Sequence, residues 1–381
     1  MKLKSLLLCS FLGLSLFAQA ETVHVLTAGS LKTLVDTTGR VIDDLTLTGS
    51  VNRSDLRYLR NHVKKLNLKD VTIAEETVGN VMYPDNVMPD SVFMEDKVLA
   101  NVVLPSGIVE IGKCAFEEVR GTAFTVDFSN CKHLQTIRNN AFSESKLQEV
   151  NLNGLTALQT IDAYAFYWTD IKRISLEGCS SLVMLGERAF CNDYFVTSVN
   201  LKGCTSLQTV GNRAFLNLAK QSGDAGILDF SETAIESFDE SSLQSSKVTT
   251  VIFPATLRTL GAKVLNLSKV ANLKFLGNVP PVVGSQWMLA SALKRAIITV
   301  PAGKVKAYAD AFGLSGADAK NLADTNGATL GINGITTAAA RAQKCYNLAG
   351  QRVGKGYKGI VIANGKKAGR PWFRRFLPRY R

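Results

Sequence analysis

The chain has 381 residues, more than one ordinary compact core needs, and a formal net charge of +12. This charge does not indicate a nucleic-acid-binding protein, because it is confined to one end. Residues 341–381 hold twelve basic and no acidic residues, whereas the remaining 340 positions carry 32 of each sign. We therefore expect no nucleic-acid partner for the folded body, although the basic tail, residues 368–381, can contact anionic surfaces.

The first 20 residues, 1–20, have the composition of a secretory signal peptide. Lys2 and Lys4 precede a short apolar run, and the A-x-A sequence at 18–20 is typical of a cleavage site. The apolar run is too short to span a bilayer. Lipidation at Cys9 is disfavoured because only a few apolar residues precede it. We expect an exported protein whose mature chain starts near Glu21.

Residues 21–98 are predicted to form an N-terminal cap with degenerate repeats. Two L-x-L segments, at 45–47 and 66–68, predict strands, and the apolar spacing over 54–60 predicts a helix between them. End repeats of an array are expected to be atypical, because they shield the stacked core from water. Residues 74–97 show no clear period, so we expect irregular structure there.

From 99 to 314 the sequence repeats itself. The pattern L-x-x-h-x-x-x-A-F, in which h is aliphatic, occurs four times, and its copies follow one another at 24 or 25 residues. Each copy comes after a short segment that alternates apolar and polar residues, as a strand does. Self-similarity at this period is typical of a solenoid. We predict an α/β solenoid, namely a leucine-rich-repeat array with short parallel strands.

The last residue of each copy is a phenylalanine that follows an alanine. Such a row of aromatic residues can form either a ligand platform or a buried column. The fixed place of the phenylalanine in the repeat favours the buried column. We expect a stacked internal spine made of Phe116, Phe142, Phe166, Phe190 and Phe215.

The C-terminal part lacks the repeat. Residues 315–340 are rich in Gly, Ala, Asp and Asn, which predicts a linker. Residues 341–367 carry short apolar segments between glycine-containing turns, which predicts a small C-terminal β module.

The mature chain offers little for catalysis. Its histidines, His24, His62 and His133, lie in separate segments, and no H-E-x-x-H, C-x-x-C, G-x-S-x-G or phosphate-binding glycine motif is present. We therefore expect a protein that is not an enzyme and that has no cofactor and no metal site.

Two cysteines of the array occupy the same place in neighbouring repeats. Cys179 and Cys204 are one repeat apart, and stacked coils lie about 4.8 Å from each other, within the Cα separation that a disulfide accepts. The competing reading is that each is a small buried apolar side chain. Cys131 has Leu155 at the same place in the next repeat, which favours the second reading, and both readings stay open.

Outward residues of the predicted strands are the candidates for partner binding. They form three polar ladders of mixed sign, which suit a protein or a glycan contact. The ladders are Glu149, Arg173 and Ser198; Asn151, Ser175 and Asn200; and Asn153, Glu177 and Lys202.

The repeated I-x-x-x-A-F sequence, the G-C-[ST]-S-L segments at 178–182 and 203–207, and T-V-P-A-G at 299–303 resemble the BspA-type leucine-rich repeats of bacterial surface proteins. This resemblance implies a protein at the cell surface, in the outer membrane or outside the cell. It also implies a non-enzymatic adhesin that binds a host extracellular or bacterial surface protein. An outer-membrane glycan-capture accessory protein is the alternative. Residues 346–367 resemble a C-terminal sorting module of exported proteins, but the ending after Gly369 departs from its pattern.

Overall fold

The computed structural model describes residues 20–330 together with four short strands near the C-terminus. The signal-peptide prediction for 1–20 and the basic tail from 369 lie almost entirely outside the described residues. The chain divides into two compact units, Met1–Thr299 and Val300–Arg381, and each is described by itself. None of the described helices has the length and apolar character needed to cross a bilayer.

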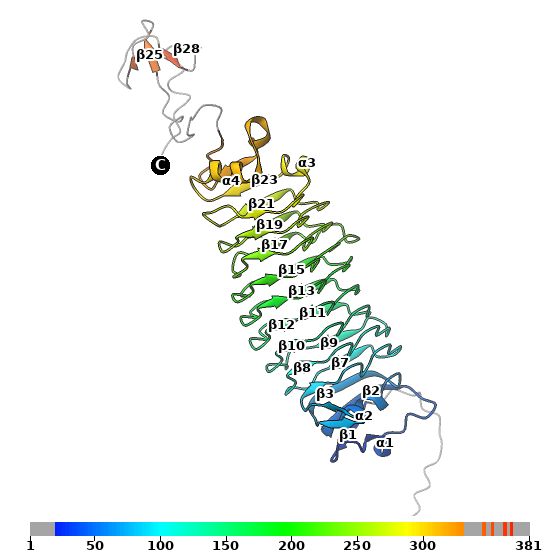
Figure 1. The fold of residues 1–381 in the computed structure, drawn as a ribbon. Coiled ribbons are helices and arrows are strands. Elements are labelled where there is room, and N and C mark those ends of the chain that lie inside the picture. Colours follow the sequence, from blue (N-terminus) through cyan, green and yellow to red (C-terminus); the bar gives the residue numbers. More distant parts are fainter. Residues whose placement is uncertain (1–19, 331–344, 348–351, 354–360, 364–365, 369–381) are drawn as a thin grey trace, which may run out of the picture. The chain divides into compact units, whose positions relative to one another are not determined.

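The first unit is a parallel β-solenoid whose coils carry two rows of strands (Figure 1). In the row of longer strands, apolar residues such as Val150 and Ile174 are buried and their neighbours point outward. The strands of this row are β7 (Asn101–Val103), β9 (Thr125–Asp127), β11 (Glu149–Asn151), β13 (Arg173–Ser175), β15 (Ser198–Asn200), β17 (Ile227–Asp229), β19 (Thr250–Phe253), β21 (Asn272–Phe275) and β23 (Ile297–Val300).

The second row consists of two-residue strands that pair in one nine-stranded parallel sheet. Most take their buried residue from the aliphatic position of the repeat, for example Ile137 and Ile161, whereas β18 has Phe238 there and β22 has no buried residue. The strands are β6 (Val87–Met88), β8 (Glu110–Ile111), β10 (Thr136–Ile137), β12 (Thr160–Ile161), β14 (Met184–Leu185), β16 (Thr209–Val210), β18 (Ser237–Phe238), β20 (Thr259–Leu260) and β22 (Val282–Val283).

The N-terminal segment continues the first row. The predicted strand, helix and strand are present as β2 (Ile42–Val51), α2 (Arg53–Tyr58) and β3 (Val63–Ile73), and they are preceded by β1 (Glu21–Val25) and α1 (Leu31–Leu34). The strands pair in the order β1, β2, β3, β7 and β9, so this segment and the array share one sheet.

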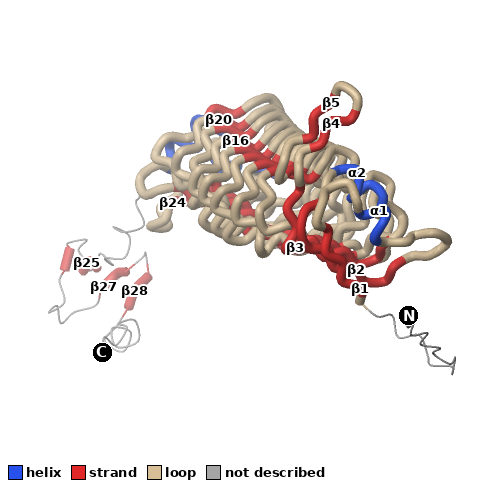
Figure 2. Tube along the Cα trace, turned by 90° about the horizontal axis from the view of Figure 1, so that it is seen from below, coloured by secondary structure: helices blue, strands red, loops and turns tan. Residues whose placement is uncertain are grey.

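The expectation of irregular structure for 74–97 is wrong. A hairpin of β4 (Glu76–Val78) and β5 (Val81–Tyr83) projects from the coils (Figure 2), and β6 then opens the second row. Phe93 stacks on Phe116, with ring centroids 5.5 Å apart. The repeat was hidden because the hairpin interrupts the period and Val92 replaces the usual alanine.

Helices are scarce in the solenoid, so the α/β description is not confirmed; the repeats are coils of strands and turns. Beyond α1 and α2, the described residues of the first unit form only the single-turn helix α3 (Ala290–Leu293). The turn around each repeat phenylalanine replaces the helix that an α/β coil would have. The residues two before and two after the phenylalanine are left-handed, for example Tyr164 (φ 59°) and Trp168 (φ 52°) around Phe166.

Hydrogen bonds between neighbouring coils hold these turns in place. The backbone N–H groups of Tyr164, Phe166 and Trp168 donate to carbonyl oxygens of the next coil at 2.8, 2.9 and 2.9 Å. A left-handed non-glycine residue costs about 1–2 kcal/mol. The turns therefore persist because stacking supplies a partner for each of these donors.

The predicted phenylalanine spine is confirmed and is one ring longer than expected. From Phe116 to Phe215 successive rings are almost parallel, with centroids 5.1 to 5.6 Å apart, and all are fully buried. Phe93 precedes them. Because the rings are buried, they form the core and do not present a ligand platform.

The second unit contains α4 (Val305–Phe312), followed by the 3-10 helix η1 (Gly316–Ala319) and β24 (Leu322–Asp324). The predicted linker from 315 is therefore structured in its described part, where Ala319 and Leu322 are buried. The Asp324 carboxylate accepts backbone N–H groups at 2.8 to 3.0 Å, which sequence composition does not reveal.

The segment of the predicted C-terminal β module contains four short antiparallel strands. They pair in the order β26, β25, β27 and β28. Their bounds are Cys345–Asn347 for β25, Arg352–Val353 for β26, Val361–Ala363 for β27 and Lys366–Ala368 for β28.

The substitution Phe166→Ala should lower the free energy of unfolding by about 3–5 kcal/mol, because it leaves a cavity between two stacked rings. Urea denaturation of the mature protein measures this loss. Phe195→Ala is the matched control, since that ring is 39% exposed and its removal should cost far less. Equal losses for the two variants would contradict the spine.

Candidate functional site

The outward residues of β11, β13 and β15 form the strand face, and their register is the one predicted. Glu149 pairs with Arg173 and Arg173 with Ser198, while Asn151, Ser175 and Asn200 follow in the next row. The structure thus brings the predicted ladder residues together. Their role in binding a partner stays a prediction.

Side chains of the strand face bind one another. The Arg173 guanidinium donates two hydrogen bonds to the Glu149 carboxylate, at 3.1 and 2.6 Å. The Asn153 side-chain oxygen accepts from Ser175 Oγ at 2.6 Å and from the Glu177 N–H at 3.0 Å. These bonds hold the polar groups in fixed positions before any partner arrives.

The same face continues through Glu177. Its carboxylate accepts from Asn200 Nδ2 at 3.0 Å and lies 4.0 Å from Lys202 Nζ. The second and third ladders are therefore connected across three coils, whereas the Glu149–Arg173 pair of the first ladder stands beside them.

A hollow lies where the first row of strands is interrupted. β9 and β11 belong to different sheets, although they are one repeat apart. The hollow has a volume of about 470 Å³, and its lining includes Asp127, Lys132, Glu149, Asn151 and Asn153. Three of the nine predicted ladder residues line it, and the other six lie further along the face.

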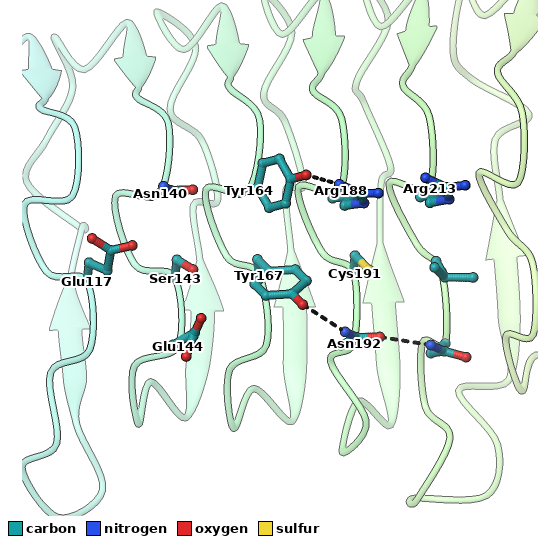
Figure 3. A pocket seen from close by; sticks show the side chains of 12 residues that line it. Glu117, Asn140, Ser143, Glu144, Tyr164, Tyr167, Arg188, Cys191, Asn192 and Arg213 are labelled. Carbon is teal, nitrogen blue, oxygen red and sulfur yellow. Dashed lines mark hydrogen bonds between the residues drawn. The ribbon is translucent and has the colours of Figure 1, made fainter.

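The turns around the phenylalanine spine carry a second surface, which the sequence reasoning missed. A groove of about 660 Å³ crosses five coils, lined by residues at three places: two before, one after and two after each repeat phenylalanine. We call it the turn-face groove. Figure 3 shows Asn140, Tyr164, Arg188 and Arg213 in one row across successive coils.

Aromatic rings occupy the middle of the turn-face groove. Tyr164 and Tyr167 meet edge to face, with centroids 5.4 Å apart, and the Arg188 guanidinium lies 5.2 Å from the Tyr164 ring. Arg188 also donates a hydrogen bond to the Tyr164 hydroxyl. Trp168 packs edge to face against the Tyr167 ring, with centroids 6.3 Å apart, and 53% of its surface is exposed.

Amide side chains extend the row of polar groups. Asn192 Nδ2 donates to the Tyr167 hydroxyl at 3.3 Å, and Asn217 Nδ2 donates to the Asn192 oxygen at 2.8 Å (Figure 3). The groove is therefore lined by ordered donors, acceptors and rings.

The groove also contains a cysteine, but not a reactive one. Burial raises the pKa of the Cys191 thiol to about 12, so the thiolate that a nucleophile needs is absent at neutral pH. The histidines do not supply a base there either. His24 contacts Thr48 at 2.9 Å, in a part of the sequence distant from the groove residues. The described residues contain no group of three His, Cys, Asp or Glu that could hold a metal.

A sequence signal for the groove existed in the variable residues on both sides of the repeated Ala-Phe pair. These positions read N, Y, R and R before the pair, and S, Y, C and L after it. Only the left-handed turns show that they share one surface, because residue propensities do not predict such a backbone at Tyr, Arg or Trp.

Cys179 and Cys204 are buried free thiols in the structure. The sulfur of Cys179 lies 3.1 Å from the Leu152 carbonyl oxygen, and that of Cys204 lies 3.2 Å from the Leu176 carbonyl oxygen. Burial raises the pKa of these thiols to about 11 and about 12. A disulfide between them stays a prediction.

One buried carboxyl group lies directly after a groove residue. Asp193 is fully buried, and its Oδ1 accepts from the N–H and hydroxyl of Thr169 at 2.9 and 2.7 Å. Its Oδ2 has no hydrogen-bond partner among the described residues. Burial therefore raises the pKa of Asp193 well above its usual value.

Comparison with models of protein families identifies the type of repeat that forms these coils. The model described as "BspA type Leucine rich repeat region" matches in six copies, over residues 86–222, 159–283 and 185–308. A comparison with curated protein sequences finds no match.

Similar solved structures are distant in sequence. A leucine-rich repeat protein from Bacteroides ovatus ATCC 8483 is 17% identical, with a TM-score of 0.40; the similarity covers 62% of this chain and 63% of that chain. The pneumococcal vaccine antigen PcpA is 15% identical, with a TM-score of 0.30, and coverage is 76% and 80%. A leucine-rich cell surface protein from Faecalibacterium prausnitzii A2-165 is 12% identical, with a TM-score of 0.23, and coverage is 69% and 88%.

The two readings of the cysteine pair differ in thiol content. Titration of the denatured mature protein should find all six cysteines as thiols if Cys179 and Cys204 are small buried residues. A bridge would lower the count in the wild type by two thiols. The Cys204→Ala variant, in which Cys179 has lost its bridge partner, would then show one free thiol more than the wild type.

The substitution Asp193→Asn should stabilise the protein near pH 7 and have less effect near pH 4. Because the pKa of Asp193 is raised on folding, the folded state keeps this proton more tightly, so stability falls as pH rises above the unfolded value of about 3.9. Urea denaturation at both pH values measures the difference.

Asp96→Asn is the matched control for this pH experiment. Asp96 is equally buried, but its carboxylate accepts three backbone N–H groups at 2.8 to 2.9 Å. Its substitution should cost about 1–3 kcal/mol at pH 7. A loss of stability at pH 7 for Asp193→Asn as well would contradict a raised pKa of Asp193 in the folded state.

Proposed function

Because this chain belongs to the BspA-type leucine-rich repeat family, we propose that it is an exported, non-enzymatic adhesin that binds a protein through its strand face. The partner is a host extracellular protein or a protein of a bacterial surface. The signal-peptide-like start supports export to the cell surface or beyond. The separation of the three histidines supports a binding role without catalysis.

The hollow at the interruption between β9 and β11 carries this proposal. It provides a concave site of about 470 Å³ whose lining includes one residue of each polar ladder, Glu149, Asn151 and Asn153. Solenoids commonly bind partners over such extended surfaces. The bonds between Glu149 and Arg173 and between Asn153 and Ser175 pre-order the site, which reduces the entropy that binding costs.

A protein partner suits the rest of the face as well. Mixed charges on the ladders favour a partner with complementary charges. Further along, outward residues Ile227 and Ile297 of β17 and β23 are 53% and 57% exposed, which offers apolar contacts beside the polar ones.

Glycan capture at the outer membrane is the second candidate. It is favoured by the amides of Asn101, Asn151 and Asn153 in the hollow, since amides can hydrogen-bond sugar hydroxyls. In this case the hollow, rather than the whole face, would make the contact.

Binding of the mature protein to panels of extracellular-matrix proteins and of glycans tests the proposal. We expect saturable binding to a protein that falls at least tenfold in the Asn151→Arg variant, because the long side chain fills the hollow. Arg258→Glu is the control, since this exposed residue lies next to β20 in the second row. Binding to glycans alone would favour the second candidate, and saturable binding to neither panel would overturn both.

A further inference from the structure

Charges of opposite sign lie at opposite ends of the turn-face groove. Glu117 and Glu144 line the end nearer the N-terminus, and Arg188 and Arg213 line the other end (Figure 3). The tyrosine rings lie between them. The groove therefore has a direction along the solenoid axis.

The basic end lacks full compensation. Arg188 is 3.3 Å from Glu187, a residue of its own turn, and is also bonded to Tyr164. Arg213, one coil further, makes no side-chain hydrogen bond or ion pair within the described part of the chain. Arg188 and Arg213 come from adjacent coils, whose backbones are about 4.8 Å apart, and two neighbouring guanidinium groups favour an anion between or above them.

The acidic end is similarly open. Neither Glu117 nor Glu144 forms an ion pair with another described residue, whereas neighbouring Glu118 is paired with Arg120 at 2.8 Å. Lys146, on the same turn as Glu144, forms an ion pair with Asp170 at 3.1 Å. The two carboxylates of the groove are thus available to a cation.

We propose that the turn-face groove binds an extended segment of a partner protein, with an acidic side chain at Arg188 and Arg213 and a basic side chain at Glu117 and Glu144. This rests on the proposed protein-binding function and adds a second contact surface to the strand face. The rings of Tyr164 and Tyr167 then pack against the middle of the segment. Tyrosine and arginine are the residues that contribute most to protein interfaces.

The coil spacing sets the spacing of the two charges in the partner. The facing charges are two to four coils apart, or about 10–19 Å at about 4.8 Å per coil. An extended chain advances about 3.3 Å per residue, so the acidic and basic side chains should be roughly three to six residues apart.

Other ligand classes fit this charge pattern less well. A nucleic acid or a sulfated polysaccharide carries one sign, so Glu117 and Glu144 would repel it. A neutral glycan can accept hydrogen bonds from Arg213, but it carries no charge to complement either end of the groove.

Selection of random displayed peptides on the immobilised mature protein tests the proposal. Enriched peptides should carry acidic and basic residues at the expected spacing, and their affinity should fall at least tenfold in Arg213→Ala and in Glu144→Gln. Arg213 has no side-chain partner among the described residues, so Arg213→Ala should fold, and its thermal unfolding should match that of the wild type. The double variant Glu144→Lys and Arg213→Glu should prefer peptides with the reverse charge order.

Arg258→Ala, beside β20 and outside the lining of both surfaces, is the matched control and should keep peptide affinity. Enriched peptides without the charge pattern, or equal binding to Arg213→Ala, would overturn the proposal. Arg213-dependent binding of an acidic glycan without peptide binding would also overturn it. If partner binding depends on Asn151 and no enriched peptide requires the groove, the proposal of peptide binding in the groove is wrong. The proposed function of the strand face is then unaffected.

Discussion

Stacking of one coil on the next is the interaction on which the whole first unit depends. Each turn from that of Phe93 to that of Phe190 donates three backbone hydrogen bonds to the following coil and places its phenylalanine against the phenylalanine of that coil. An aromatic pair contributes about 0.5–1.5 kcal/mol beyond its buried area, and the bonds offset the cost of left-handed residues such as Tyr164. Because every coil must meet the next in this way, all coils keep nearly one circumference.

Strict stacking of the core leaves function to the side chains that face outward. Residues at equivalent places line up in rows, so a change of one letter in the repeat alters one point of a continuous surface. On the strand face, side chains of neighbouring coils bind one another, as in the pairing of Arg173 with Glu149. The turn-face groove leaves Arg213, Glu117 and Glu144 without ion-pair partners among the described residues. Two surfaces of one scaffold can thus serve different contacts.

Where sequence patterns failed, a contact distant along the chain was responsible. The coil that ends in Phe93 lost its alanine and gained a hairpin, so only the ring stacked on Phe116 identifies it. The helical part of an α/β coil was expected from the family of folds, but a turn with two left-handed residues closes each coil. Such residues are stable here because the next coil satisfies their N–H groups, which no local propensity records.

The sequence by itself determined the repeat, its period, the buried leucines and phenylalanines, and the register that aligns Glu149 with Arg173. These follow from spacing alone, because coils of equal length must superimpose. Only the tertiary structure decided that β9 and β11 part to open a hollow, and that Tyr164, Arg188 and Arg213 share a groove. Both depend on how neighbouring backbones meet in space, and spacing along one chain does not contain that information.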